Sequence, residues 1–548
     1  MKTKLLALFV LLSGIINAQT PNWVWARAAG GTSEEMGNGV AVDINGNVYV
    51  TGAFKSPTVT FGSIVLTNTP SIWHDVFVVK YDHNGTVIWA KSGGGNSDDV
   101  GNSVAVDAIG NVYVTGFIGG TSTFGSYTLT SAGNADFFLV KYDPNGTVLW
   151  AKSAGGIDHD KGYGVALDGF GNIYVTGTYT ATNITFGTTV LNQIGSIDIF
   201  VVKYDPNGNV IWAKSGGGNS VDESTSIAVD SIGNAFITGG YDSNTITFGT
   251  ASLNNYGNLN PDCFLVKYNP TGNVLWARSF GGINNEAGEA IAIDHTGNVF
   301  INGYYDGDSV SIGNIVLYGD PNSVNGVFTV KYDSLGNILW ARAALGAANE
   351  DPHGIAVDGI GNSFITGDFT NSFIVFGNDT VHAVGVADIY LAKYDPNGNT
   401  VWAKSQGGSE GDYTYSIASS YNGDIYITGK NDSPNLVFGS DTLVHSTGLN
   451  ADFFVAKLST PLTGIHPIDN EPNISIYPNP AQNNFRISLP QTSFDVTITD
   501  VFGREVYSGK QLSEKTEIDV SNLLNGIYIV RAVSGNNNYY SGKIMIMK

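Results

Sequence analysis

The order of hydrophobic and polar residues predicts short β-strands joined by tight turns along most of the chain. Residues 77–81 (Phe-Val-Val-Lys-Tyr) have the β-branched and aromatic side chains that strands favour. Residues 82–85 (Asp-His-Asn-Gly) follow as a turn, because Asp bonds to its own backbone there and Gly accepts a positive φ. Residues 86–91 return as a second strand, and a second hairpin follows over residues 104–115. One unit of the pattern therefore holds four strands.

This unit occurs seven times. Each copy starts with Trp-Ala and a Lys or Arg, continues with a strand that ends in Gly, and finishes with a strand that ends in Lys. Successive copies lie 61 to 64 residues apart, and a repeated four-stranded unit is typical of a β-propeller blade. The tryptophans that start the copies are Trp25, Trp89, Trp150, Trp212, Trp276, Trp340 and Trp402.

The two ends of the repeat tract complement each other. The first Trp strand (23–28) has no preceding Lys strand to pair with, and the last Lys strand (452–458) has no following Trp strand. Pairing them would close a ring and leave no open edge, which favours a propeller over an open solenoid. We therefore predict an all-β fold in which residues 19–458 form a seven-bladed β-propeller, closed by pairing of its N- and C-terminal strands.

The small residues of each copy predict which strand lies innermost, because space is tightest near a propeller axis. In every copy an alanine follows Val or Ile, and before these stands Gly, Ser or Ala. We expect this strand to line a central channel, and the tryptophans to fill the space between blades. The alanines are Ala41, Ala105, Ala166, Ala228, Ala292, Ala356 and Ala418.

The first 18 residues have the features of a secretory signal. Lys2 and Lys4 precede an apolar core at residues 5–16, and Ala18 offers a small side chain for cleavage before Gln19. We therefore predict a signal peptide over residues 1–18. This core is too short for a membrane helix, and no later apolar stretch is long enough, so we expect no transmembrane segment in the mature chain.

The repeat stops after residue 458. Residues 459–473 contain Pro, Ser, Thr and Gly, and we predict a linker there. Residues 474–548 are expected to form a small Ig-like β-sandwich. Its predicted strands are residues 485–489, 496–501, 527–533 and 544–547.

Composition and charge narrow the range of partners. The chain has a formal net charge of −22, and this excess of carboxylates repels phosphate backbones. We therefore expect no nucleic-acid partner, whereas cations and basic partners are favoured. The single cysteine, Cys263, cannot form an internal disulfide, and its strand-like neighbours predict a small buried hydrophobic side chain.

One set of acidic residues follows the repeat and is a candidate site. A carboxylate stands eight residues after the Lys or Arg of every Trp-Ala motif, in the loop that enters the expected inner strand. Seven such groups around a channel mouth would favour a hard cation such as Ca²⁺. A repeated ion pair or loop cap that ties blades together explains the constant spacing better. We call these residues the repeat carboxylates: Glu35, Asp99, Asp160, Asp222, Glu286, Glu350 and Asp412.

A functional site on a repeated scaffold is expected where the repeat is broken. The third copy carries Asp-His-Asp-Lys at residues 158–161, and the sixth carries Glu-Asp-Pro-His at residues 350–353. Histidine with carboxylates binds metals or moves protons, although exposed polar loops have the same composition. His74 stands in the first of the loops that precede the Lys strands, and these loops are the most variable part of each copy.

Two motifs resemble known families. Residues 46–52 and 110–116 (Gly-Asn-Val-Tyr-Val-Thr-Gly) resemble bacterial seven-bladed β-propeller repeats, which implies the fold but hardly an activity. Residues 501–506 and 523–528 and the closing residues 543–548 resemble the type A sorting domain of the type IX secretion system. The single residues that carry this second resemblance are Tyr477, Pro478, Asn479, Pro480, Gly503 and Gly526.

The resemblance of the tail implies a route and a destination. It implies the type IX secretion machinery as a partner, removal of the tail, and release into the medium or attachment to the outer surface of a Gram-negative cell. On arrival we expect a non-enzymatic binding module for a surface glycan or protein. A polysaccharide hydrolase or lyase with an acidic site at the propeller mouth, and a purely structural envelope protein, are the alternatives.

Overall fold

A computed structural model describes most of residues 21–460 and 475–547. Ala18, Gln19, the rest of the expected signal peptide, most of the expected linker, and Gly503 lie outside the described residues. The chain divides into two compact units, Met1–Pro461 and Leu462–Lys548. No helix among the described residues is long and apolar enough to cross a membrane. The gaps are residues 69, 71, 258–259, 320–324, 347–348, 371, 422, 446–449, 489–492, 501–504, 514–515, 524–525 and 535–538.

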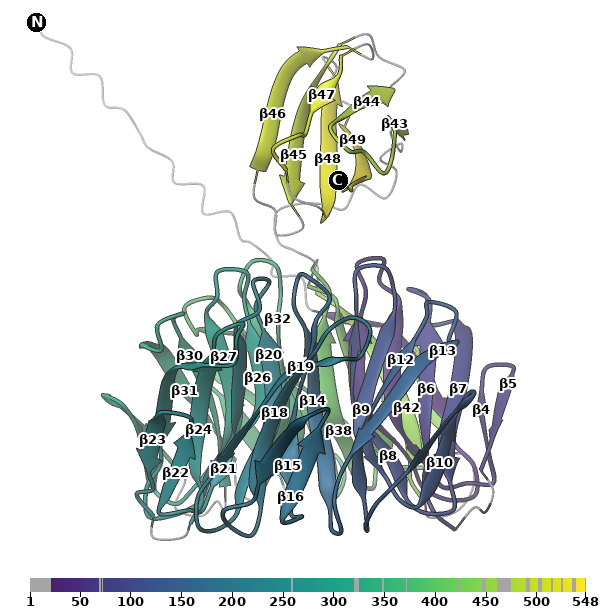
Figure 1. Cartoon of the computed structure of the whole chain (residues 1–548). Helices are drawn as coiled ribbons and strands as arrows, with labels where there is room; N and C mark the ends of the chain where they lie inside the picture. The colour runs from purple at the N-terminus through teal and green to yellow at the C-terminus, as the bar shows by residue number, and fades with distance from the viewer. Residues whose placement is uncertain are drawn as a thin grey trace, which may run out of the picture. The chain divides into compact units, whose positions relative to one another are not determined.

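The first repeat shows how each blade-like array is built (Figure 1). Strands β2 (Glu35–Val42), β3 (Val48–Phe54), β6 (Asp75–Tyr81) and β7 (Val87–Gly95) pair in this order, all antiparallel. Every residue of β3 and β6 is buried, because both faces of these central strands are covered. A short outer hairpin, β4 (Thr58–Phe61) and β5 (Ile64–Thr67), lies between β3 and β6 in sequence.

The second to sixth repeats form the same antiparallel array. The second contains β8 (Asp99–Val106), β9 (Val112–Ile118), β12 (Asp136–Tyr142) and β13 (Val148–Ala154), and the third contains β14 (Asp160–Leu167), β15 (Ile173–Tyr179), β18 (Asp198–Tyr204) and β19 (Val210–Gly217). The fourth contains β20 (Asp222–Val229), β21 (Ala235–Tyr241), β24 (Asp262–Tyr268) and β25 (Val274–Phe280). The fifth contains β26 (Glu286–Ile293), β27 (Val299–Asp306), β30 (Asn325–Tyr332) and β31 (Ile338–Gly346). The sixth contains β32 (Glu350–Val357), β33 (Ser363–Thr370), β36 (Ala387–Tyr394) and β37 (Thr400–Gln406).

Each later repeat also carries an outer hairpin, and three of these hairpins extend the array of the preceding repeat. The first strand of the second, fourth and sixth hairpins pairs with β7, β19 and β31, respectively. The hairpins therefore help to join neighbouring arrays. They are β10 (Thr121–Phe124) with β11 (Tyr127–Thr130), β16 (Asn183–Phe186) with β17 (Thr189–Asn192), β22 (Thr245–Phe248) with β23 (Ala251–Asn254), β28 (Ser309–Ile312) with β29 (Ile315–Tyr318), β34 (Phe373–Phe376) with β35 (Asp379–His382), and β40 (Asn435–Phe438) with β41 (Asp441–Val444).

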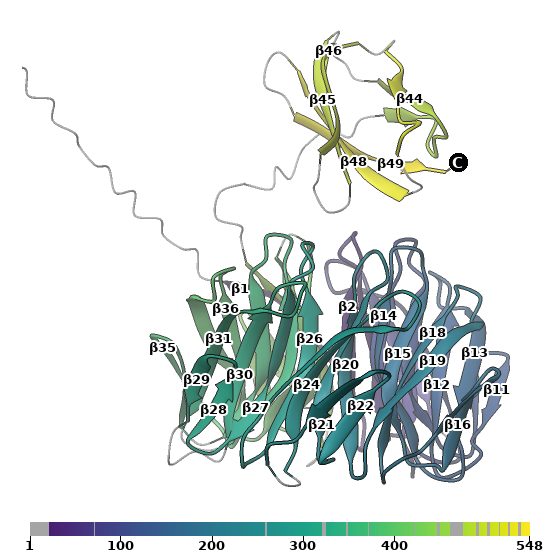
Figure 2. The same cartoon turned by 60° about the vertical axis from the view of Figure 1, so that its left-hand side comes forward.

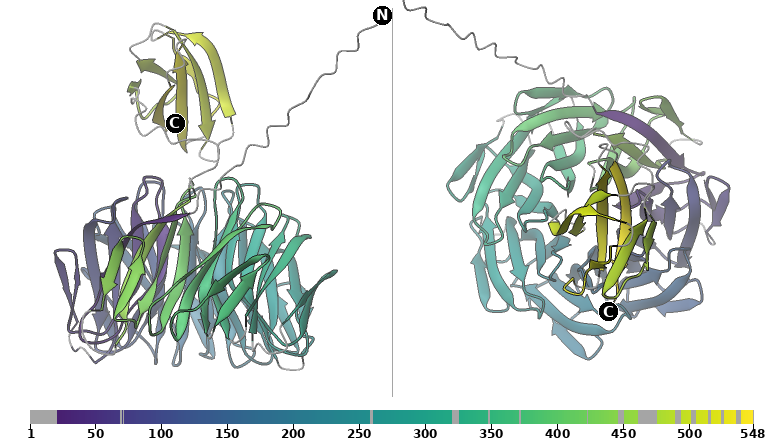
Figure 3. Two further views of the ribbon diagram at one scale, coloured as in Figure 1. Left: turned by 180° about the vertical axis from the view of Figure 1, so that it is seen from behind. Right: turned by 90° about the horizontal axis from the view of Figure 1, so that it is seen from above.

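One array combines strands from both ends of the repeat tract. Strands β38 (Asp412–Ser419), β39 (Ile425–Asn431) and β42 (Asp452–Ser459) are followed in the sheet by β1 (Asn22–Ala29). Asn22 is paired with Ser459, and Trp25 with Lys457. Viewed from above, the arrays surround a common axis, and the purple β1 lies beside the green strands of the last repeat (Figure 3).

The tryptophans pack between neighbouring arrays. The ring of Trp25 lies 6.3 Å from that of Tyr81, and its indole N–H donates to the carbonyl of His83 in the turn of the first array. Gly85 in this turn has a φ of 78°, and a Cβ there would lie 2.7 Å from the Trp25 ring. Glycine is thus favoured at this turn for two reasons: the backbone has a positive φ, and a side chain would collide with the tryptophan of the preceding array.

The C-terminal unit contains two antiparallel sheets (Figure 2). Its core includes Phe485, Ile498, Val530 and Ile544, each at most 1% exposed. One sheet contains β43 (Ser475–Tyr477), β44 (Asn484–Ser488) and β47 (Ile518–Asp519). The other contains β46 (Glu505–Leu512), β45 (Phe494–Asp500), β48 (Gly526–Ser534) and β49 (Tyr539–Ile546).

Candidate functional site

A cavity of about 300 Å³ lies on the axis and is lined by all seven inner strands. The small residues that precede the repeated alanines, such as Gly39 and Ser103, are part of its wall, so this strand lines the channel as the sequence predicts. The third residue after each repeat carboxylate also lines the cavity, and it differs between copies. These residues are Asn38, Asn102, Tyr163, Thr225, Glu289, His353 and Tyr415.

The acidic residues of this channel gather on one side. Glu289 on β26 lines the cavity, Glu223 on β20 lies exposed, and Asp351 on β32 is partly buried. Burial, together with the charges of Glu223 and Asp351, raises the pKa of Glu289 to about 7, although His353 opposes the shift. Desolvation of the carboxylate and the charge of Asp242 raise the pKa of Glu223, although the charge of Lys161 opposes the shift. Glu223 and Asp351 thus lie within electrostatic range of Glu289, and the three residues stand on successive inner strands.

His353 on β32 is a basic residue of the cavity wall whose charge acts on Glu289. Its Nε2 lies 2.7 Å from Oδ1 of the buried Asp368 on the neighbouring strand β33. Burial opposes a charge on the imidazole, but the bond to Asp368 and the charges of Glu289 and Asp351 outweigh it and raise the pKa of His353. Its ring also packs edge-on against Tyr415, 5.6 Å away. The sixth-copy constellation predicted from sequence is thus partly brought together, with Asp368 and Glu289 as members that sequence reasoning missed.

A second charged group, in the first and last arrays, is internally paired. Lys430 Nζ lies 3.1 Å from Glu34 Oε1, and His74 Nδ1 lies 3.0 Å from Asp98 Oδ1. The ion pair with His74, whose Nε2 lies 3.8 Å from Glu34 Oε2, and the contact with Lys430 lower the pKa of Glu34 to about 2 despite partial burial. This group satisfies its own charges. In the third copy, His159 is exposed while Asp160 is buried, so those residues do not form one site.

The repeat carboxylates are completely buried, and each is the first residue of its inner strand rather than part of the loop before it, as the sequence suggests. The carboxylate of Glu35 accepts hydrogen bonds from the amides of Gly31 (2.8 Å) and Ser56 (3.0 Å), and Asp222 accepts from the Ser243 hydroxyl (2.8 Å). These contacts are those of a loop cap. Among the described residues, no group of three or more His, Cys, Asp or Glu is arranged to hold a metal ion.

The cations of the Trp-Ala motifs bind elsewhere. Arg27 Nε donates to the carbonyl of Gly85 and Arg278 Nε to that of Gly336, both in turns of the following array. Lys404 Nζ donates to the carbonyl of Pro21. The interpretation of the constant spacing as an ion pair with the repeat carboxylate is therefore corrected for these arginines and this lysine: their side chains donate to backbone carbonyls of the following array.

A second buried carboxylate accompanies most repeat carboxylates. Asp75, Asp136 and Asp198 are the first residues of their strands. Besides burial, the charges of Asp136 and Asp198 raise the pKa of the repeat carboxylate in the next array, and the pKa of Asp75 is itself raised by the repeat carboxylate Asp99. Burial and the charge of Asp99 raise the pKa of Asp75 to about 7, and burial with the charge of Asp98 raises the pKa of Asp99 to about 7. Cys263 is buried, as expected from the sequence, and burial raises the pKa of its thiol.

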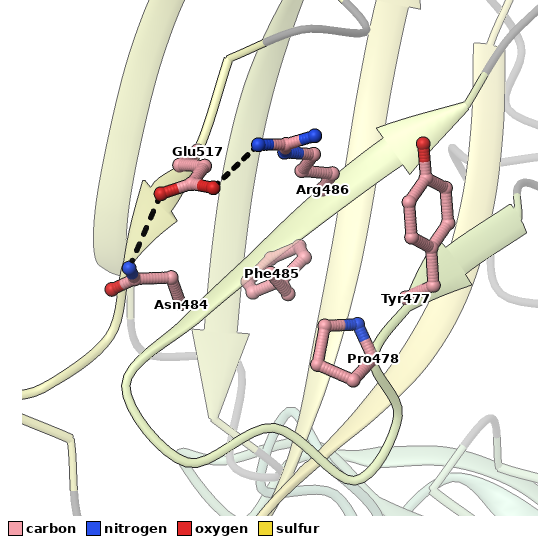
Figure 4. A pocket seen from close by; sticks show the side chains of 6 residues that line it. All are labelled: Tyr477, Pro478, Asn484, Phe485, Arg486 and Glu517. Atoms are coloured by element: carbon pink, nitrogen blue, oxygen red, sulfur yellow. Dashed lines mark hydrogen bonds and ion pairs between the residues drawn. The ribbon is translucent and has the colours of Figure 1, made fainter.

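Two of the sorting-motif residues line a pocket of about 250 Å³ in the C-terminal unit (Figure 4). Tyr477 and Pro478 line it together with Phe485 and the ion pair of Arg486 and Glu517, whose atoms lie 2.6 Å apart. Next to them, the Asn479 side chain donates to the carbonyl of Lys543 and accepts from the amide of Met545. The Asn of the motif thus fastens this loop to the closing strand β49.

Fold and motifs together define an exported repeat protein with a sorting tail. Residues 475–547 match the family of secretion system C-terminal sorting domains, and residues 24–53 and 150–184 match the β-propeller repeat family. Both family resemblances of the sequence are thereby confirmed. The tail directs export by the type IX secretion system to the outer-membrane surface or the medium, and it implies association with that secretion machinery.

Three individual proteins that this chain resembles are at most 28% identical to it over the aligned residues. An uncharacterized WD repeat-containing protein of Acanthamoeba polyphaga mimivirus is 28% identical over 79% of this chain and 38% of its own length. The regulatory protein FlaEY of Caulobacter vibrioides is 25% identical over 54% of this chain and 33% of its own. The chain thus spans less than two fifths of these relatives. The structure of PorZ, a surface component of the type IX system of Porphyromonas gingivalis, aligns with 93% of this chain and 75% of its own, at 12% identity and a TM-score of 0.23.

Proposed function

We propose that the protein is a non-enzymatic binding module that the type IX system delivers to the cell surface or medium. Its frame is a closed seven-bladed propeller over residues 19–458, joined by a linker at 459–473 to an Ig-like sorting domain at 474–548. The antiparallel pairing of β1 with β42 supports closure, and the two antiparallel sheets of the C-terminal unit support the sandwich.

The observation that carries the binding function is the loss of sevenfold repetition in the channel. Residues with a structural role in the blade occur in every copy, and the tryptophans and the buried carboxylates are examples. The cavity-lining position instead changes from Asn to Tyr, Thr, Glu and His around the axis. Convergent polar groups of different kinds in one concave site are what a ligand of defined shape and charge requires.

The binding function is tested with the full exported chain. The protein, bound to beads through its termini, is incubated with solubilised cell envelope and with a glycan array. We expect specific retention by the wild type and by the surface variant Glu410→Gln, and a loss of retention in the double variant Glu289→Gln/His353→Asn. Equal retention by all three would place binding outside the channel, and retention by none would remove the binding function in favour of a structural envelope role.

A hydrolase or lyase is the second candidate. Glu289, with its pKa raised to about 7, has the protonation behaviour of a general acid, and Asp351 is a carboxylate in its electrostatic range. Release of reducing ends or of unsaturated sugars from envelope polysaccharides, abolished by Glu289→Gln, would favour this candidate over a binding module.

A further inference from the structure

The acidic side chains are distributed unevenly around the channel, and this distribution indicates the chemical class of the expected ligand. On the fourth to sixth arrays the channel carries Glu223, Glu289 and Asp351, whereas the first two arrays contribute Asn38 and Asn102 to the cavity. A neutral ligand would not compensate this asymmetry, and an anion would be repelled by it. A cation placed beside Glu289 would be attracted from three inner strands at once.

The carboxylate of Glu289 is available for such a contact. Within the described part of the chain, no hydrogen bond or ion pair engages its oxygens, in contrast to Asp368, which binds His353, and to Glu34, which binds Lys430. The side chain lines the cavity and is only partly exposed. A partly desolvated carboxylate without a protein partner interacts more strongly with an incoming cation than an exposed one does.

The size and walls of the cavity favour an organic cation over a metal ion. No set of three or more ligating side chains in the described ranges is arranged for a metal, and a volume of about 300 Å³ is larger than a bare ion needs. Tyr163 and Tyr415 line the same cavity. Aromatic faces attract ammonium groups and favour an alkyl chain next to the charge.

We propose that the channel cavity binds a primary alkylammonium group, with Glu289 as its direct partner and Glu223 and Asp351 as the outer negative charges. The source of this group is either a free diamine or a lysine side chain of a partner polypeptide, since both present the same chemistry. The proposal rests on the proposed binding function and narrows it to a ligand class. A diamine contacts the cavity directly, so its binding can be measured without knowing the natural partner.

The experiment is isothermal titration calorimetry on the full exported chain at low ionic strength. The probes are 1,5-diaminopentane, Nα-acetyl-lysine amide and, as an uncharged match, 1,5-pentanediol. We expect at least one amine to bind and the diol not to bind. Glu289→Gln, which keeps shape and removes charge, should weaken amine binding about tenfold or more, because a charge-assisted contact is lost. Glu410→Gln changes the net charge equally at an exposed position and should leave binding unaltered.

The arms of the experiment separate the possible outcomes. Binding of the lysine derivative alone points to a partner polypeptide, and binding of the diamine alone to a free amine; either result supports the proposal. Equal binding of the diol, unchanged amine binding in Glu289→Gln, or binding of neither amine would overturn it. If neither amine binds but envelope material is still retained through the channel, the ligand class is wrong and the binding function stands.

Discussion

The amide of Asp99 donates a 2.8 Å hydrogen bond to the carbonyl of His74, and this bond sets Asp99 beside Asp75 at the junction of two arrays. Both side chains are buried, and one oxygen of each, Oδ2 of Asp99 and Oδ1 of Asp75, lacks a hydrogen-bond partner. Burial of both groups and the charge of Asp99 next to Asp75 favour a protonated carboxyl at this junction. The junction between arrays is therefore sensitive to pH.

We predict that Asp75→Asn stabilises the protein increasingly as the pH rises from about 4 to about 8. The pKa of both groups lies near 7 in the folded chain, above the ordinary value of 3.8, so the folded state holds protons that the unfolded state releases in this range. Stability from the pair is present at low pH and is lost as the pH rises toward 7. The measurement is the difference in Tm between variant and wild type across the range.

The half-buried turn residue Asp82 provides the opposite control. The amides of Thr86 and Asn84 lower its pKa, although burial alone would raise it. Its contribution is therefore gained as the pH rises, and Asp82→Asn should destabilise the chain more at pH 8 than at pH 4. A Tm difference for Asp75→Asn that shrinks with rising pH would contradict the shared-proton junction.

We predict that Trp25→Ala and Trp212→Ala lower Tm by similar amounts. Each indole N–H donates over 3.1 Å to a turn carbonyl of the next array, and both rings are buried. Loss of a buried tryptophan typically costs about 3–5 kcal/mol. Trp73→Ala, at a residue that is 42% exposed, should have little effect. A mild effect of Trp25→Ala alone would mean that β1 is not held in its sheet.

We predict that removal of divalent metals with EDTA leaves the Tm of the exported protein unchanged. The carboxylates of Glu35 and Asp222 already accept hydrogen bonds from amides and a hydroxyl, which are the contacts that a Ca²⁺ ion would replace. The check is thermal unfolding with EDTA and after addition of Ca²⁺. A rise in Tm with Ca²⁺ that disappears in Asp222→Asn would instead support the metal hypothesis for the repeat carboxylates.

We predict that Asp368→Asn lowers the pKa of His353 toward its ordinary value. The bond of 2.7 Å between the two side chains is the largest favourable influence on the imidazolium, and the amide cannot supply its charge. The pKa is measured from the ring resonances of His353 in NMR titrations. Asp379→Asn, on the outer strand β35, serves as the control and should leave the titration unaltered.

The features that can be predicted best from the sequence are those that occur in all seven copies of the repeat. The tryptophans, the turn glycines and the inner Gly/Ser/Ala strand recur at equivalent positions of the arrays, so their main physical role can be read from one copy. The sequence predicts the repeat carboxylates near a channel mouth, because loops that enter a strand are usually exposed. In the structure the amides of Gly31 and of Ser56, which stands 21 positions after Glu35, donate to the Glu35 carboxylate.

Signals for part of the missed chemistry were present. A second Asp recurs five residues before the strand-ending Lys in six copies, as Asp75 and Asp136 illustrate, and its regularity could have shown a paired role. The channel residues were harder to find. The sequence shows only that Glu289 stands where other copies have residues such as Asn38 and Thr225. Its proximity to His353 depends on how neighbouring arrays are placed around the axis, which local sequence patterns do not encode.

The sharing of one sheet by β1 and β42 has a consequence for export. The N-terminal strand leaves the ribosome first, yet its hydrogen-bonding neighbour is the last strand of the tract to be made. Until that neighbour arrives, β1 has unsatisfied amides and carbonyls, and joining such distant segments carries an entropic cost. Premature completion of the fold is thereby delayed, which suits a chain that must remain threadable until its tail has been synthesised.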